Sequence, residues 1–266
     1  MVLLKNIDRL DYIASDLLGS NAKITHAFLT RKGGVSAGVF SSLNFNLRDG
    51  DDYANVEYNK AKIGKLFGFD TLNLATVNQM HGSDIFIIDS INLLSKSKDI
   101  MADAITTNLS AVPIAVLTAD CLPVLLYDRI NKAIAVVHAG WKGTLNRVLQ
   151  KSVMVMGKTW GTLPQHLAAA LGPAIGRCCC NVDETVIVPF KQEFPDNNDF
   201  IFEAGKGWMF DLKKANYNQL AAIGLSEDNI WMDTHCTSCR QDLFFSYRRD
   251  NKKTGRHLNF MMLKEG

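Results

Sequence analysis

Residues 112–123 read Val-Pro-Ile-Ala-Val-Leu-Thr-Ala-Asp-Cys-Leu-Pro, an apolar run followed closely by an acidic residue and a cysteine. Two further apolar runs of this kind occupy residues 85–88 and 133–137. Short apolar runs bounded by polar residues or glycine are typical of buried strands. Each run borders one potential metal ligand: Cys121, His81 and His138, respectively. The sequence therefore predicts three ligands at strand ends, where rigid elements can hold a precise site.

One His, one Cys and a second His form a ligand set that suits zinc. Structural zinc sites usually close with four protein ligands, whereas catalytic sites use three and leave the fourth position to water or substrate. A single buried cysteine or histidine is usually an ordinary core residue, and only the combination of three favours a metal site. We expect His81, Cys121 and His138 to bind one zinc ion, which would lower the pKa of a bound water from about 15.7 to about 7.

The rest of the chain alternates between helical and extended patterns. Helical spacing of apolar residues predicts helices over residues 51–68, 144–159, 185–194 and 211–224. Strands are expected over residues 24–30 and 168–171, and residues 230–233 are expected to begin a last strand pair that residues 258–263 close. Strands outnumber helices and their order is irregular, so periodicity alone indicates only a fold of mixed α and β elements.

Composition limits the possible functions. The chain has 266 residues, of which 47% are hydrophobic and 21% charged, which is ordinary for a globular protein with a full core. A net charge of +2 gives no broad electrostatic footprint for nucleic acid. We see no linker-like stretch, no signal peptide and no apolar run long enough to span a membrane. With six cysteines and no such signal, we expect a reducing compartment, the cytoplasm, and no membrane partner.

Several segments match one protein family in order along the chain. They are residues 79–82 (Gln-Met-His-Gly), 119–123 (Ala-Asp-Cys-Leu-Pro), 138–143 (His-Ala-Gly-Trp-Lys-Gly), 172–176 (Gly-Pro-Ala-Ile-Gly) and 244–249 (Phe-Phe-Ser-Tyr-Arg-Arg). Residues 30–36, 42–44 and 254–256 fit the same family. Over nearly its whole length the chain thus resembles the family once called multicopper polyphenol oxidoreductases or laccases, also known as the YfiH-like proteins.

This resemblance implies a fold and an activity. The implied fold is α+β, a layered α/β sandwich with mixed β-sheets, and residues 1–266 would form one catalytic domain. The resemblance also implies zinc at His81, Cys121 and His138. It further implies a purine nucleoside phosphorylase that converts adenosine, inosine or methylthioadenosine and phosphate to base and ribose 1-phosphate, with adenosine deaminase activity. A role in keeping peptidoglycan precursors correct is implied for bacterial members.

Attack on an adenine ring and phosphorolysis ask for different side chains. Zinc deaminases use a carboxylate as proton shuttle, and Asp120 is the nearest carboxylate to the three ligands in sequence. Asp120 could equally order the strand end or orient a ligand histidine. Phosphate is best held by guanidinium groups, for which Arg31 and Arg248 are the candidates within matched segments, with Arg48 outside them.

Aromatic side chains could stack on a flat purine base. Trp141, Phe245 and Tyr247 are the candidates, although an aromatic residue is more often part of the core. Three more residues from the matched segments complete the set that we expect to bind substrate: Asn44, Gln79 and Lys142.

The remaining cysteines allow more than one interpretation. Cys236-Thr-Ser-Cys239 is a CxxC pair that could be half of a zinc site, a redox pair or a chance occurrence. Together with residues 178–180, which are three consecutive cysteines, it could hold a second, structural metal ion. Surplus thiols packed in loops are the simpler interpretation, which the sequence favours.

Three other functions use the same ligand set. In a cysteine hydrolase or amidase, Cys121 would be the nucleophile and His138 its base. A copper phenol oxidase also uses two His and one Cys, but six histidines in the whole chain are too few for a multicopper centre. A non-catalytic metal module would leave the open fourth position without a purpose. A stoichiometric zinc bound by Cys121 would argue against the hydrolase.

Overall fold

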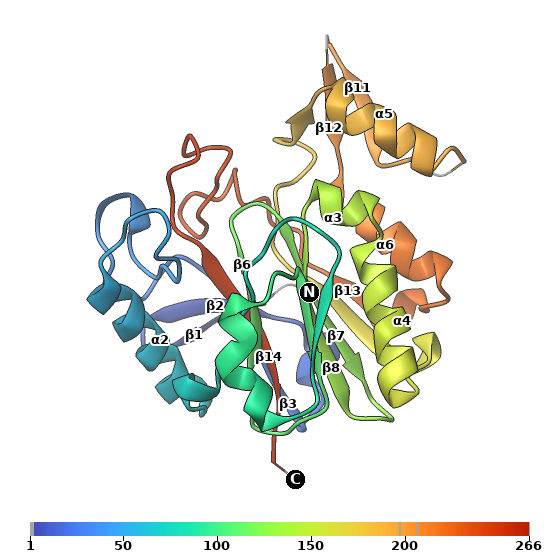
Figure 1. Cartoon of the computed structure of the whole chain (residues 1–266). Coiled ribbons are helices and arrows are strands. Elements are labelled where there is room, and N and C mark those ends of the chain that lie inside the picture. The colour runs from blue at the N-terminus through green and yellow to red at the C-terminus, as the bar shows by residue number, and fades with distance from the viewer. Residues whose placement is uncertain (1–2, 197, 206, 266) are drawn as a thin grey trace.

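Two β-sheets lie face to face at the centre of the molecule (Figure 1). The computed structural model describes residues 3–196, 198–205 and 207–265. The five-stranded sheet has the order β1 (Leu3–Ile7), β2 (Leu10–Ala14), β3 (Ile24–Leu29), β14 (His257–Leu263), β6 (Ile114–Thr118). The six-stranded sheet has the order β13 (Ile230–Met232), β9 (Leu167–Leu171), β7 (Leu122–Asp128), β8 (Ala133–Ala139), β5 (Ala104–Thr107), β4 (Ile85–Ile88).

Strand directions differ between the two sheets. All neighbouring strands of the five-stranded sheet are antiparallel. In the six-stranded sheet, β13 runs parallel to β9 and β4 runs parallel to β5, whereas the central pairs are antiparallel. The expected α+β sandwich with mixed sheets is therefore confirmed.

Helices cover both outer faces of this pair of sheets (Figure 1). Helix α2 (Tyr53–Phe67) packs on the five-stranded sheet, and α4 (Val148–Trp160) and α6 (Leu212–Ala222) pack on the six-stranded sheet. Helix α5 (Glu184–Glu193) accompanies a small sheet of order β10 (Asn181–Val182), β12 (Gly207–Phe210), β11 (Ile201–Ala204). The described residues also include the short helices α1 (Asp16–Gly19) and α3 (Trp141–Leu145) and 3-10 helices at Gly38–Phe40, Thr71–Asn73, Ile91–Asp99, Pro164–His166 and Glu227–Asn229.

Alternation along β7 and β8 explains why these strands lie at the centre. On β7, Leu122, Val124 and Leu126 face the helices, whereas Leu125 and Tyr127 face the other sheet. Successive side chains of a strand point to opposite faces, so a strand that is apolar at every position must be covered on both sides. Every residue of β7 and β8 is buried. The two strands consequently form a rigid base from which Cys121 and His138 project.

Two predicted elements are wrong. Residues 144–159 are not one helix, because Arg147 adopts a left-handed backbone conformation (φ 60°) that separates α3 from α4. Strands β13 and β14 do not pair: β13 joins β9 in one sheet, whereas β14 lies between β3 and β6 in the other. Sequence proximity near the C-terminus is therefore misleading, because residues 233–256 carry the chain from one layer to the other.

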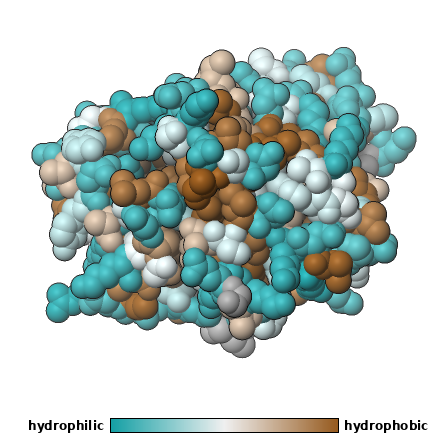
Figure 2. Space-filling model, turned by 60° about the horizontal axis from the view of Figure 1, so that its bottom comes forward, coloured by the Kyte–Doolittle hydropathy of each residue, from teal (hydrophilic) through white to brown (hydrophobic). Residues whose placement is uncertain are grey.

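The face shown in Figure 2 is largely hydrophilic, with apolar side chains gathered near its middle. Among the described residues, no helix combines the length and the apolar character that a membrane span requires.

Candidate metal centre and active site

The structure brings the three predicted ligands together although they are far apart in the sequence. His81 lies in the loop before β4, Cys121 lies in the turn between β6 and β7, and His138 lies near the end of β8. Their ligand atoms all lie within 4.8 Å of one another. The Cys121 Sγ is 3.9 Å from Nδ1 of His81, and the ring centroids of His81 and His138 are 4.8 Å apart. This spacing is close enough for one ion to contact all three side chains.

Asp103, which sequence reasoning missed, organises two of the three ligands. Its carboxylate accepts a hydrogen bond from Nδ1 of His138 at 2.8 Å. It also accepts the backbone N–H groups of Met80, His81 and Gly82. Asp103 is only 1% exposed and directly precedes β5. A carboxylate that fixes the distal nitrogen of a histidine and leaves the other nitrogen for a metal is a recurrent feature of zinc sites.

Gly140 leaves the space in which the ligands meet. A Cβ atom at this position would lie 2.9 Å from Nδ1 of His81 and 3.1 Å from Sγ of Cys121. Carbon atoms do not approach so closely without displacing a neighbour, so any larger residue would push the ligands aside. His81 itself adopts a positive φ of 56°, which is unusual for a residue other than glycine. The hydrogen bonds from the His81 loop to Asp103 stabilise this conformation.

The protonation states of the three side chains depend on one another. Burial alone would raise the pKa of the Cys121 thiol, but His138 and His81 outweigh burial and lower that pKa. Burial alone would lower the pKa of His138, but the Cys121 thiolate and Asp103 together raise it. Burial also opposes ionisation of Asp103, whose pKa is nevertheless lowered by His138 and by the backbone donors. The site therefore favours a thiolate, which is the form of cysteine that binds metals and acts as a nucleophile.

The donor set fits a metal ion. One thiolate and two imidazoles are the ligands that zinc prefers, and three protein donors leave one position for a further ligand. The same set could accept copper. The metal-competent groups found among the described residues are this one and a group of four cysteines, and neither offers the many histidines that a multicopper centre needs.

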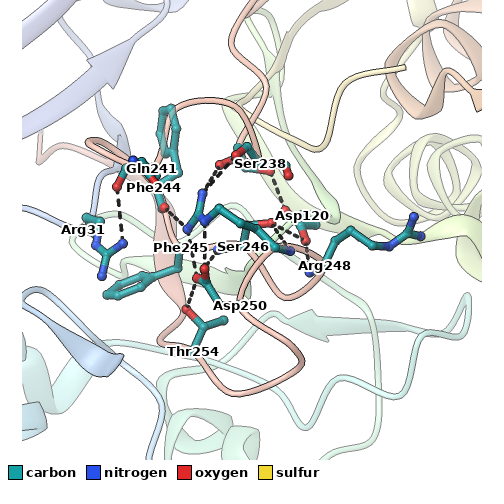
Figure 3. Close-up of polar contacts among 12 residues, drawn as sticks. Arg31, Asp120, Ser238, Gln241, Phe244, Phe245, Ser246, Arg248, Asp250 and Thr254 are labelled. Atoms are coloured by element: carbon teal, nitrogen blue, oxygen red, sulfur yellow. Dashed lines mark hydrogen bonds and ion pairs between the residues drawn. The ribbon is translucent and has the colours of Figure 1, made fainter. Parts of the chain in front are cut away.

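Of the two structural roles considered for Asp120, the structure supports ordering of the chain next to Cys121 rather than orientation of a histidine, and its catalytic role stays a prediction. Its carboxylate accepts hydrogen bonds from the hydroxyl groups of Thr237 (2.6 Å) and Ser246 (2.9 Å) and from the backbone N–H of Arg248 (2.7 Å). Figure 3 shows Asp120 bonded to Ser246 and to the backbone of Arg248. Asp120 has a positive φ of 91°. It thus fixes the C-terminal loop next to Cys121, whereas Asp103 orients His138.

Arg248 lies near the site through its backbone, but its side chain points elsewhere. In Figure 3 the side chain extends away from Asp120. Its Nη1 donates to the carbonyl oxygens of Asn181 (2.7 Å) and Cys179 (3.4 Å), and the residue is exposed. The backbone of Arg248 is linked through Asp120 to the segment that carries Cys121, and its role in the active site stays a prediction.

The burial of Phe245 contradicts its predicted role of stacking on a base. Its side chain is 0% exposed, and the Arg31 guanidinium lies over its ring at 4.6 Å. Arg31 also donates to the carbonyl oxygens of Ser41 and Gln241. Tyr247, by contrast, is 41% exposed. Among the aromatic residues of this loop, Tyr247 therefore presents more of its surface to a ligand.

Asn44 and Gln79 make contacts that order loops. Asn44 is fully buried and bonds to Asn46, to Asp51 and to the backbone N–H of Arg256. The Gln79 side chain bonds to both backbone groups of Leu117. These bonds speak against direct substrate contacts for both residues.

Trp141 and Lys142 begin helix α3, two residues beyond the end of β8. Trp141 is half-buried against the core, and Lys142 is exposed with its ammonium 5.5 Å from the Trp141 ring centre. Both residues follow His138 closely in the sequence, and their substrate contacts stay predictions.

An open hollow of about 520 Å³ lies elsewhere, between α4 and α5. Asn146, Arg147, Lys151 and Glu193 are among the residues that line it, and its lining includes none of the predicted site residues. The chemistry of the ligand cluster, rather than the size of this hollow, identifies the candidate site.

With this geometry established, comparison with known proteins identifies the family. Residues 25–264 match the family model described as multi-copper polyphenol oxidoreductase laccase. The chain belongs to this family. Within the family, it is 32% identical over 243 residues to purine nucleoside phosphorylase YlmD of Geobacillus stearothermophilus, covering 89% of each protein. It is 34% identical over 236 residues to purine nucleoside phosphorylase YfiH of Escherichia coli, covering 88% of this chain and 91% of that protein.

Solved structures of the family share the fold. The crystal structure of YlmD from Geobacillus stearothermophilus superimposes with a TM-score of 0.92 at 29% identity, over 100% of both chains. The structure of YfiH from Bacillus licheniformis gives a TM-score of 0.87 at 30% identity and covers 97% of this chain and 98% of that one. The resemblance found in the sequence is thereby confirmed for both the family and the fold.

Proposed function

We propose that this protein is a zinc-dependent purine nucleoside phosphorylase that also deaminates adenosine. Its substrates would be adenosine, inosine or methylthioadenosine together with phosphate, and its products the free base and ribose 1-phosphate. The observation that carries the proposal is the cluster of His81, Cys121 and His138, aligned by Asp103, in a chain whose relatives are named purine nucleoside phosphorylases.

Zinc, when bound, would supply Lewis-acid polarisation and a lower pKa for a water or substrate group at the open position. The chain's own contribution is orientation. Asp103 holds Nδ1 of His138, so that Nε2 of this ring remains free to bind the ion. Gly140 keeps the space between the ligands free of a side chain. The three donors therefore lie within reach of one ion.

Arg248 is the residue that we propose for phosphate. Its backbone N–H is fixed by Asp120, the neighbour of Cys121, and its exposed guanidinium can pair with an anion. Arg31 is a weaker choice, because it is less exposed than Arg248 and its guanidinium stacks on the buried Phe245. Trp141 and Tyr247 are the proposed surfaces for the base, since both retain exposed area.

Product analysis tests the proposal. The purified protein is incubated with adenosine and phosphate, and the products are separated by chromatography. Adenine with ribose 1-phosphate supports phosphorolysis, and inosine supports deamination. If neither product forms at any zinc concentration, the proposed function is wrong.

Substituting Gly140→Ala tests the dependence on the ligand cluster. The added Cβ would displace His81 or Cys121, so we expect zinc content and both activities to fall together. Gly19→Ala is the matched control, because a Cβ there meets only an ordinary contact at 3.9 Å from His26. A Gly140→Ala protein that loses zinc but still phosphorolyses nucleosides would contradict the zinc requirement.

A cysteine hydrolase or amidase is the second candidate, for which one observation speaks. Cys121 could act as the nucleophile, His138 as its base and Asp103 as the carboxylate that orients the base, an arrangement that activates a thiolate. Alkylation with iodoacetamide distinguishes the two functions. A hydrolase would be active without metal and would lose its activity when Cys121 of the metal-free protein is alkylated. In a zinc enzyme, the bound zinc ion would protect the Cys121 thiolate from alkylation.

The compartment belongs to the same proposal. All six cysteines are free in the structure, which suits a reducing compartment such as the cytoplasm.

A further inference from the structure

Four cysteines from two distant turns meet outside the candidate active site. Cys178 and Cys179 lie in the turn that follows β9, and Cys236 and Cys239 lie in a turn near the start of the C-terminal loop. Their sulfur atoms all lie within 4.8 Å of one another. We call these residues the four-cysteine cluster.

The sulfur separations agree with metal coordination and not with disulfide bonds. Sγ of Cys239 is 3.6 Å from Sγ of Cys178 and 3.4 Å from Sγ of Cys179. A disulfide bond is about 2.05 Å long. Four sulfurs at about 2.3 Å from a tetrahedral zinc ion would be separated by about 3.8 Å. In addition, Sγ of Cys239 is close to two other sulfur atoms, whereas a disulfide bond joins a sulfur atom to only one other.

The surrounding backbone prepares the sulfurs for this role. The N–H of Gly176 donates to Sγ of Cys236 at 3.1 Å. A Cβ on Gly176 would lie 3.1 Å from Cβ of Cys236 and 3.2 Å from Sγ of Cys178, so glycine at this position favours the close approach of the two turns. Hydrogen bonds from backbone N–H groups favour a thiolate, which is the metal-binding form.

Fixed positive charge accompanies the cluster. Nζ of the buried Lys213 donates to the carbonyl oxygens of Asp233 and His235, both at 2.7 Å, and so holds the segment leading to Cys236. Nη1 of Arg248 donates to the carbonyl oxygen of Cys179. Four thiolates around a divalent ion carry a net charge of about −2. Arg248 and Lys213 would compensate part of it, although the Lys213 ammonium also lies 3.8 Å from a carboxylate oxygen of Asp233.

We propose that the four-cysteine cluster binds a second zinc ion in a closed, tetrahedral, structural site. The ion would join two turns that lie 60 residues apart in the sequence. Both turns contact Asp120, the first through the backbone N–H of Ile175 and the second through the hydroxyl of Thr237. The second zinc ion would therefore stabilise the loops beside Cys121 without taking part in the reaction.

Metal analysis of the full-length protein and its variants tests this proposal. Wild type should contain about two zinc ions per chain, and Cys239→Ser should contain about one, because three remaining thiolates bind a structural zinc ion poorly. Cys180→Ala is the matched control: Cys180 is adjacent in sequence but packs in the hydrophobic core, so this variant should keep both ions. Cys121→Ala should lose the ion of the active site and keep that of the cluster.

A spectroscopic measurement on Cys121→Ala remains informative even if Cys239→Ser fails to fold. After exchange of zinc for cobalt, this variant should show the absorption of tetrahedral cobalt bound by four thiolates. Three results would each overturn the proposal. The first is a wild type that holds at most one metal ion per chain and loses it in Cys121→Ala. The others are iron in place of zinc and a disulfide bond within the four-cysteine cluster. If Cys121→Ala keeps the single ion and Cys239→Ser loses it, the cluster assignment stands and the proposed zinc-dependent function fails.

Discussion

Asp103 and Asp120 are both buried carboxylates close to the ligand cluster, yet they order different parts of the molecule. Asp103 bonds to one ligand ring and to the backbone of the loop that carries a second ligand. Asp120 is adjacent to Cys121 in sequence but bonds to Thr237, Ser246 and Arg248. Proximity in sequence thus does not decide which carboxylate serves the metal ligands.

The difference follows from what each carboxylate can reach. Asp103 precedes β5, which pairs with β8, and the pairing of Ala104 with Val137 places Asp103 beside His138. Asp120 lies in the turn between β6 and β7 and faces the C-terminal loop, which crosses this end of the sheets (Figure 3). One carboxylate therefore controls ligand geometry and the other controls the position of a loop that we propose to bind substrate.

The largest effect is expected for Asp103→Asn. An amide keeps one acceptor oxygen but turns an NH2 group toward N–H donors, so the His138 ring and the His81 loop lose their fixed positions. Loss of such a partner typically costs about 10–100-fold in metal affinity. Competition with a chromophoric chelator measures the zinc affinity.

Asp128→Asn is the matched control for this variant. Asp128 is also fully buried but lies at the opposite end of β7, where it bonds to Ile130 and Asn131. We expect Asp128→Asn to lower stability and to leave zinc affinity unchanged. Equal zinc affinity in Asp103→Asn and wild type would remove the distinction between the two carboxylates.

Asp120→Asn should show the reverse pattern. The variant leaves Ser246 or the Arg248 N–H without its acceptor in a buried setting, which should lower the free energy of unfolding by roughly 1.5–3 kcal/mol. Zinc content should be that of wild type, because the Asp120 carboxylate bonds to Thr237, Ser246 and Arg248 rather than to a candidate metal ligand. Urea denaturation and metal analysis on the same sample provide the test, and loss of zinc at unchanged stability would refute it.

Buried histidines outside the ligand cluster sharpen the comparison with His138. Burial lowers the pKa of His257 to about 3 and that of His26 to about 4, and a backbone N–H donates to Nε2 of each ring. Both pKa values lie below the ordinary 6.5, so the unfolded chain binds more protons and stability falls as pH drops below about 6.5.

When the pH falls from 6.5 to 5, each of these histidines should lower the free energy of unfolding by about 1.5 kcal/mol. Urea denaturation at several pH values measures the slope. His257→Gln, which cannot take up a proton, should unfold with a shallower pH dependence than wild type. An unchanged slope in this variant would mean that His257 titrates alike in both states.

Arg248→Lys is expected to have the smallest effect. Lysine keeps the charge but loses the planar pair of donors, so phosphorolysis at limiting phosphate should slow by about tenfold. Zinc content and stability should change little, because the side chain is exposed. Steady-state rates at varied phosphate measure this, and a wild-type rate at limiting phosphate would exclude Arg248 as the phosphate-binding residue.

Local patterns predicted the central elements well where the pattern has a single explanation. The apolar runs at residues 112–117 and 133–137 contain most of strands β6 and β8, and the helix predicted over residues 51–68 is α2, with Asp52 as N-cap and Gly68 at its left-handed end. Local patterns gave the wrong strand pairing where partners far apart in the sequence determine it. Nothing local in residues 258–263 specifies that β14 inserts between β3 and β6.

The sequence by itself determined the candidate ligands, since His81, Cys121 and His138 each lie in a distinctive segment beside a predicted strand. It could not reveal Asp103, because one aspartate among many comes to bond to the candidate ligand His138 only through the β5–β8 register. It also could not separate the exposed Tyr247 from the buried Phe245 two residues earlier. Ligand identity is a property of single side chains, whereas orientation and burial depend on segments brought together by packing, and only the tertiary structure decides them.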